Sequence, residues 1–273
     1  MSETPQTLFQ AGKLDEALAQ SLALVKKNPA NSGLRFQLAE ISCIAGDLER
    51  AERQMETVSN QDPNAALGAA LFRQLVRAEM ARRECFFEGR VPEFIGEPNP
   101  VIKRHLLALA AIREGDLGEA AALIQDQTDV DTTVARAATT WDVNGEAVGE
   151  LRDLDDLLAP ILEVHTSTGK YFWIAWDQIL SMEVHPPKRS ADLLWRQASL
   201  SIESGPDGEV YLPAIYLDPS QPVAEDESLR LGRSTDWVET HESIVRGRGQ
   251  KMLLAGNQDL TFMQLESIER QES

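Results

Sequence analysis

The spacing of apolar and polar residues divides the chain into two parts. From residue 5 to residue 127, apolar side chains recur every three or four positions, the pattern of helices that bury one face. Residues 89–100 carry three prolines and are expected to form a loop within this part. The helices predicted by the pattern cover 5–11, 14–25, 32–45, 48–59, 65–88, 101–113 and 117–127.

The first helices are arranged as copies of one pair. The segment AGKLDEA at 11–17 recurs as AGDLERA at 45–51, and the two glycines are 34 residues apart. A third version, EGDLGEA, lies at 114–120. A period of 34 residues with glycine at the turn is the signature of tetratricopeptide repeats, in which antiparallel helix pairs stack on one another.

Each position of the repeat has a physical role. Glycine ends the first helix because it adopts a positive φ without a Cβ clash. Asp47 and Asp116 are expected to cap the second helix of their pairs, and Asn64 the long helix after it. An alanine allows close helix contact, and a proline stops the second helix of the first two pairs. These structural positions are Gly12, Ala17, Pro29, Gly46, Ala51, Pro63, Gly115 and Ala120.

The helical period ends near residue 131, and all five tryptophans lie beyond it. Alternating and β-branched segments separated by turn residues predict strands in this part. We therefore expect an α+β protein of two domains, a helical repeat domain at 1–130 and a mainly β domain at 131–273, with the boundary within 126–140. The strands are expected at 139–143, 146–151, 161–165, 170–174, 179–185, 199–203, 209–212, 251–254 and 260–265, with a helical turn at 153–158.

The charge of the chain excludes some classes of partner. It holds 44 acidic and 26 basic residues, a formal charge of −18, which repels nucleic acid and anionic membrane surfaces. No apolar run is long enough for a membrane span, and residues 1–5 do not resemble a signal peptide. Cys43 and Cys85 lie singly within helical patterns, so we expect buried free thiols in a cytoplasmic protein; a disulfide between them is the alternative.

Several sequence motifs resemble catalytic or metal sites but lack required residues. TSTGK at 166–170 lacks the first glycine of a phosphate-binding loop and the hydroxyl residue after its lysine, so a hairpin turn is expected. The four histidines have no ligand-like spacing, and no nucleophile–base signature is present. Asp153, Asp155 and Asp156 are interpreted as a solvated acidic helix start, with a cation site as the alternative. No cofactor, metal or catalytic residue is therefore predicted.

Arginine and tryptophan cluster at two places in the second part. One interpretation is that tryptophan packs in a core and Arg–Asp pairs hold loops; the other is an exposed hot spot for a partner protein. Arg246, Arg248 and Lys251 are interpreted as a basic loop that adds solubility, with a partner contact as the alternative. The partner-binding candidates are Trp195, Arg196, Arg230, Arg233, Asp236 and Trp237.

Motifs along nearly the whole chain resemble one family. They include LFQAGKLDEA at 8–17, the PILEV and GKYFW segments at 160–173, and DLLWR at 192–196. Further motifs are GEVYLP at 208–213, LRLGRSTDW at 229–237 and GQK at 249–251. In this order they are similar to the ImpE/TagJ/SciE family, accessory proteins of the bacterial type VI secretion system. Residues 174–178 depart from the family by lacking a proline after the aromatic strand.

The resemblance implies a cytoplasmic, non-enzymatic adaptor. It implies binding to the N-terminal helix of the small contractile-sheath subunit (TssB/VipA type) and a link to the ClpV AAA+ unfoldase that recycles spent sheath. Independently, stacked helix pairs present a concave face suited to a helix or an extended peptide. The alternatives are a tetratricopeptide chaperone for a secreted effector, and an enzyme whose site lies in the second domain.

Overall fold

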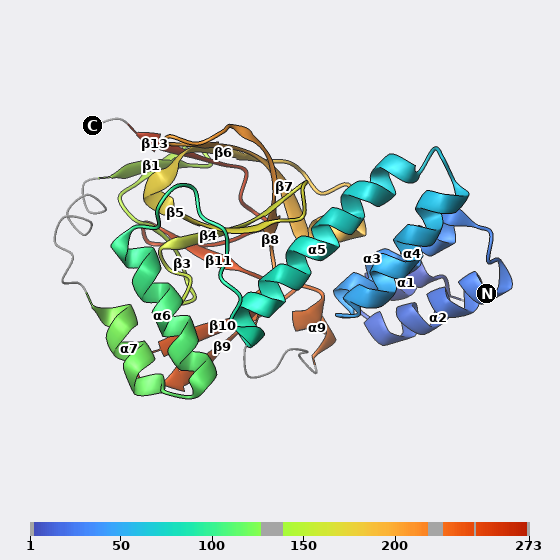
Figure 1. The fold of residues 1–273 in the computed structure, drawn as a ribbon, viewed down its shortest axis with the longest axis horizontal. Coiled ribbons are helices and arrows are strands. Elements are labelled where there is room, and N and C mark those ends of the chain that lie inside the picture. The colour runs from blue at the N-terminus through green and yellow to red at the C-terminus, as the bar shows by residue number, and fades with distance from the viewer. Residues whose placement is uncertain (1–2, 127–138, 218–225, 243, 272–273) are drawn as a thin grey trace.

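The computed structural model describes residues 3–126, 139–217, 226–242 and 244–271. Helices come first and antiparallel strands follow, which confirms the expected α+β class (Figure 1). The helices are α1 (Pro5–Gln10), α2 (Leu14–Lys27), α3 (Ser32–Ile44), α4 (Leu48–Gln61), α5 (Ala66–Glu88), α6 (Pro100–Glu114), α7 (Leu117–Gln125) and α9 (Glu227–Arg230).

The predicted bends lie where the repeat places them. Gly12, Gly46 and Gly115 separate α1 from α2, α3 from α4 and α6 from α7, with φ values of 85°, 89° and 83°. The Asp47 side chain accepts a hydrogen bond from the Arg50 amide at 2.9 Å, and Asp116 caps α7 in the same way. Both cap predictions are therefore confirmed.

The alanine and proline positions of the repeat are also confirmed. Ala17, Ala51 and Ala120 are fully buried between helices. Pro29 and Pro63 follow the last residues of α2 and α4 by two positions each. Proline disfavours helical φ and ψ in the residue before it, so each helix ends there.

The predicted cap of α5 was wrong. Ala65, and not Asn64, is the N-cap, and it makes no side-chain bond to the helix. Asp62 Oδ1 instead accepts the Asn64 amide at 3.0 Å, which stabilises the turn around Pro63 and moves the start of α5 one residue later.

Helix α5 belongs to both halves of the molecule. Its first half packs Phe72, Leu75 and Val76 against the repeats, and its second half packs Cys85 and Phe86 against the strands. Figure 1 shows it running diagonally from the repeats to the β part. A single long helix therefore connects the two halves without an intervening loop.

The third helix pair packs differently from the first two. Ile102, Ala108 and Leu109 of α6 share a hydrophobic cluster with Leu157 and Trp173 of the β part. In Figure 1, α6 and α7 lie under the strands, at the opposite end of α5 from α1–α4. The stacked repeats are therefore confined to α1–α5, and the division into domains at residue 130 remains a prediction.

The described strands form three antiparallel sheets. The largest has the order β2-β1-β13-β6-β7-β8-β4-β5; the others are β10-β9 and β12-β11-β3. The strands are β1 (Thr140–Val143), β2 (Glu146–Val148), β3 (Leu151–Asp153), β4 (Ile161–Thr166), β5 (Tyr171–Ala175), β6 (Ile179–Val184), β7 (Trp195–Ile202), β8 (Gly208–Pro213), β9 (Thr235–His241), β10 (Ile244–Gly249), β11 (Met252–Ala255), β12 (Gln258–Thr261) and β13 (Ser267–Gln271).

The predicted β hairpins are present, with two corrections. Asn144 and Gly145 both have positive φ, as the predicted tight turn requires. The strand expected at 146–151 ends at Val148, and Leu151 begins a separate strand that pairs with β11. The hairpin β9–β10 was missed: β9 is exposed at several positions on both faces, so its sequence lacks the usual alternation.

The two cysteine thiols are free. Cys43 and Cys85 are both buried and unpaired, as expected.

In the part of the chain that the structure describes, every helix is too short or too polar to cross a bilayer.

Candidate protein-binding groove

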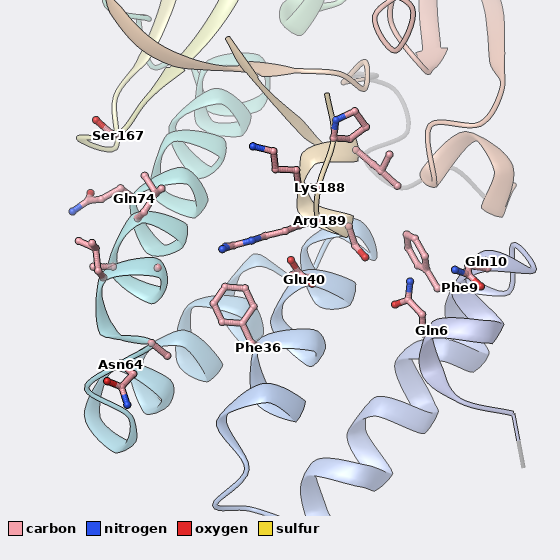
Figure 2. A pocket seen from close by; sticks show the side chains of 18 of the residues that line it. Gln6, Phe9, Gln10, Phe36, Glu40, Asn64, Gln74, Ser167, Lys188 and Arg189 are labelled. Carbon is pink, nitrogen blue, oxygen red and sulfur yellow. The ribbon is translucent and has the colours of Figure 1, made fainter. Parts of the chain in front are cut away.

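A groove of about 1490 Å³ lies between the helical repeats and the β part. Figure 2 shows Gln74 of α5 and Asn64 of the preceding turn on one side, and Gln6 and Phe9 of α1 on the other. Helix α3 contributes Phe36 to the surface between them. The groove therefore occupies the face of the repeats on which a bound segment is expected.

The floor of the groove is apolar. Phe36 contacts Phe72 edge to face, with ring centroids 5.8 Å apart, so the aromatic floor is continuous with the core of the repeats. Leu67 and Leu71 of α5 also line the groove, and Leu67 is 85% exposed. An exposed leucine beside aromatic rings forms an apolar surface that a partner can cover.

The roof is a segment of the β part between β6 and β7. The Asp192 carboxylate accepts the amides of Lys188 and Arg189 at 2.7 and 2.9 Å, which holds the segment in a compact turn. Ala191 is buried in the same cluster as Phe72 of α5. The roof is thus fixed to the repeats by packing.

Charged side chains surround the apolar floor. The Arg189 guanidinium lies over the Phe36 ring, 5.7 Å from its centroid, in a cation–π contact (Figure 2). Burial raises the pKa of the Glu40 carboxyl to about 7, and the nearby Arg189 only partly offsets this. Lys188 and Arg233 add two further positive charges to the groove.

The dimensions and residue types of the groove favour a peptide over a small molecule. Pockets for small ligands are about 300–1,000 Å³ and bury most of the ligand, whereas this groove is larger and open to solvent. Its lining includes two phenylalanines and two arginines, residue types that are enriched at protein interfaces. The arrangement can bind an amphipathic segment by its apolar side.

Of the predicted site residues, Trp195 and Arg196 are buried. Trp195 lies edge to face with Phe72, 5.6 Å between centroids, and belongs to the core that α5 shares with β7. Arg196 donates to the carbonyl oxygens of Phe262 and His185 at 3.0 Å each. The hot-spot interpretation was wrong for these two residues, because neither reaches the surface, and the packing interpretation describes them.

Arg230 and Arg233 connect α9 and the following turn to the repeats of the same chain. Arg230 Nη1 lies 3.0 Å from Asp15 Oδ1 of α2. Arg233 donates to the carbonyl oxygens of Phe9 and Gln10 at 2.7 and 3.1 Å. These arginines bind backbone and a carboxylate of α1 and α2, and the pairing with Asp236 considered from sequence is absent among the described contacts.

Asp236 and Trp237 lie on the exposed strand β9. Trp237 is 38% exposed, and its ring lies 6.0 Å from that of Tyr216. Asp236 accepts the Trp237 amide at 2.9 Å. Both remain predicted contacts for a partner, although neither lines the groove.

Two interpretations made from the sequence were wrong: the solvated acidic helix start at 153–156 and the solubilising basic loop at 246–251. Most of these charged side chains are buried. Asp153 lies in β3, and Asp155 accepts two bonds from Arg246 Nε at 2.8 and 2.9 Å. Lys251 lies 3.5 Å from Asp153 and also pairs with Glu163. Arg246 and Lys251 are each 1% exposed, so they do not form a solubilising loop. Opposite charges on distant segments neutralise one another, a pairing that spacing along the sequence cannot show.

The motif and the histidine that the sequence brought into question have structural surroundings. TSTGK at 166–170 forms the turn between β4 and β5, with Gly169 at a φ of 83°, as expected. Burial lowers the pKa of His165 to about 4, so its imidazole is neutral near pH 7. Within the described ranges, no three His, Cys, Asp or Glu side chains are placed to hold a metal ion.

Of the residues that line the groove, the sequence predicted only Arg233 as a contact for a partner. Phe36, Leu67 and Leu71 lie within the predicted helices but were not singled out. Lys188 and Arg189 follow Pro186 and Pro187, a proline–basic run that marks an exposed connection between strands. That run was the one available signal, but the sequence does not show that it lies against α3.

Comparisons with known proteins agree with the resemblance. Residues 145–269 match the family model described as ImpE protein, and residues 8–75 match a tetratricopeptide repeat model. The chain is 28% identical over 269 residues to the type VI secretion system accessory component TagJ of Pseudomonas aeruginosa, which covers 97% of this chain and 90% of that protein.

A solved structure matches the whole chain. The crystal structure of protein VPA1032 from Vibrio parahaemolyticus is similar with a TM-score of 0.88 at 25% sequence identity, covering 98% of both chains. The arrangement of repeats, α5 and sheets is therefore shared along the full length. The family resemblance and the fold class predicted from the sequence are both confirmed.

Proposed function

We propose that this chain is a non-enzymatic adaptor of a bacterial type VI secretion system, because its C-terminal part matches the ImpE family model and its N-terminal part a tetratricopeptide repeat model. The similarity to an accessory component of that system supports the pathway. The open apolar groove supports an adaptor, since it provides a surface on which a segment of a partner protein can bind.

The proposed ligand is the N-terminal helix of the small contractile-sheath subunit (TssB/VipA type). The observation that carries this proposal is the groove, whose floor of Phe36, Leu67 and Leu71 fits the apolar side of an amphipathic helix. A protein that holds this helix in the cytoplasm would link the sheath subunit to the ClpV unfoldase, the second proposed partner.

Titration calorimetry with a synthetic peptide of that helix tests the proposal. Saturable binding is expected at micromolar affinity or tighter, about −8 kcal/mol. Leu67→Glu should weaken binding at least tenfold, because it puts a charge on the apolar floor. Leu107→Glu is the matched control, since Leu107 is an exposed leucine on α6 outside the groove.

The experiment also separates the alternatives. Absence of a saturable signal with the wild-type chain would reject the sheath-subunit proposal. Equal binding by wild type and Leu67→Glu would place the helix on another surface. If the chain is instead a chaperone for a secreted effector, it should co-purify with one secreted protein encoded near its own gene. That protein should compete with the sheath-subunit peptide for the groove.

A further inference from the structure

We infer that the groove binds an acidic amphipathic α-helix that crosses α5 at Gly68, with its apolar side on Phe36, Leu67 and Leu71 and its carboxylates beside Lys188 and Arg189. This inference rests on the proposed function, in which a helix is the ligand, and adds where that helix lies and which charge it carries. The inference stands on three observations: an unexplained glycine, a line of apolar residues, and a local charge opposite to that of the chain.

Gly68 lies in the first turn of α5 and lines the groove. A glycine inside a helix costs about 1 kcal/mol relative to alanine. No atom lies within 4 Å of the position that a Cβ would occupy, so packing within the chain does not require glycine there. The missing side chain leaves backbone open to the groove, which allows a second helix to approach closely, as small residues do at other helix–helix contacts.

The apolar residues form a line on either side of this glycine. Leu67 and Leu71 are four positions apart and share a face of α5. Phe36 of α3 extends this surface across the groove floor (Figure 2). A helix laid in the groove would therefore bury its apolar stripe against both α3 and α5, with Gly68 at the point of closest contact.

The charge of the groove is opposite to that of the molecule. The chain has a formal charge of −18, yet the charged residues of the groove are Lys188, Arg189, Arg233 and Glu40, three basic and one acidic. Arg233 binds two backbone carbonyl oxygens, which are neutral. Glu40 is largely buried, and its raised pKa of about 7 reduces its negative charge near neutral pH. A ligand with carboxylates gains attraction here, whereas a basic ligand meets repulsion.

Binding of designed helices tests the charge of the ligand. Two fluorescent amphipathic peptides share one apolar stripe, and one carries glutamate and the other lysine at the flanking positions. The glutamate peptide should bind the full chain at least tenfold more tightly at low salt, and this preference should shrink in 0.5 M salt. Equal binding, tighter binding of the lysine peptide, or no binding of the glutamate peptide would overturn the inference.

Two substitutions with matched controls test the position of the ligand. Gly68→Ala should raise the melting temperature by about 2 to 4 °C, yet weaken binding of the glutamate peptide severalfold. Gly118→Ala, in α7 and outside the groove, should stabilise the chain without changing affinity. Lys188→Glu should weaken binding about tenfold, and Lys26→Glu, at the exposed end of α2, should not.

The outcomes distinguish this inference from the function on which it rests. If the sheath-subunit helix binds but Gly68→Ala and Lys188→Glu bind as wild type, the proposed function stands and the inference fails. If the glutamate peptide binds as expected but the sheath-subunit helix does not, the sheath-subunit proposal fails and the assigned ligand chemistry stands. A dimer in light scattering that Leu67→Glu dissociates would assign the groove to a second copy of the chain and overturn the inference.

Discussion

Arg82 of α5 and Glu163 of β4 form a buried, bidentate ion pair. Nε of Arg82 lies 2.8 Å from Oε1 of Glu163, and Nη2 lies 3.0 Å from Oε2. Burial opposes ionisation of Glu163, but Arg82 and Lys251 outweigh it and hold the pKa of this carboxyl well below its usual range. The pair joins the helix that ends the repeats to the largest sheet of the β part.

Loss of this arginine should destabilise the protein. Arg82→Met leaves Glu163 buried with one cation fewer, and removal of one partner of a buried pair costs about 3–5 kcal/mol. Chemical denaturation followed by circular dichroism measures this loss. Arg77→Met is the control, because Arg77 is half exposed and pairs with Glu52 at the surface, so a change under about 1 kcal/mol is expected. Equal stability of both variants would contradict the proposed connection.

The Glu40 carboxyl should make stability depend on pH. Its pKa in the folded protein is about 7, against an ordinary value of 4.5, so the folded state binds more protons between these values and its stability falls as pH rises. Glu40→Gln removes this dependence. Relative to wild type, the variant should gain about 2 kcal/mol between pH 5 and pH 8, measured by urea unfolding at both values. Glu49→Gln, on the exposed side of α4, should show no such gain.

A charge at the second repeat alanine should disrupt the repeats. Ala51 is fully buried in the cluster that contains Ala39, Met55 and Phe72, so Ala51→Glu introduces both excess volume and an unpaired charge. A loss of several kcal/mol and a large drop in melting temperature are expected. Ala19→Glu, at an exposed position of α2, is the control. An unchanged melting temperature for Ala51→Glu would show that the helix contact is not where the structure has it.

The two thiols should be unreactive in the folded protein. Burial raises the pKa of Cys85 to about 12 and that of Cys43 well above its ordinary value, so little thiolate is present at pH 8. A disulfide-exchange reagent should label neither cysteine in buffer and both in denaturant. Fast labelling of the native protein would mean that α3 or α5 opens on the time scale of the assay.

The repeat positions were predictable because they depend on local chemistry. Glycine at a bend, aspartate at a cap and alanine at a close contact act within a few residues of one another, and the structure places Gly46, Asp47 and Ala51 as expected. The Asn144–Gly145 turn was predictable for the same reason. The start of α5 was mistaken since Asp62 competed for the Asn64 amide.

The groove and the buried charges were not predictable, because they depend on contacts between distant segments. Arg189 meets Phe36 only because the β6–β7 connection folds over α3. Arg246 neutralises Asp155, which lies 91 positions away in the sequence. A basic residue that the sequence alone would place in solvent is therefore buried. Trp195 and Arg230 were singled out correctly as unusual, but their partners lie within the chain.

The continuity of α5 has a mechanical consequence. A 23-residue helix is a rod of about 35 Å, and it carries groove residues near one end and sheet contacts near the other. The helix is continuous between these two sets of contacts. The length of α5 therefore sets how far the groove lies from the part of the sheet on which the helix ends.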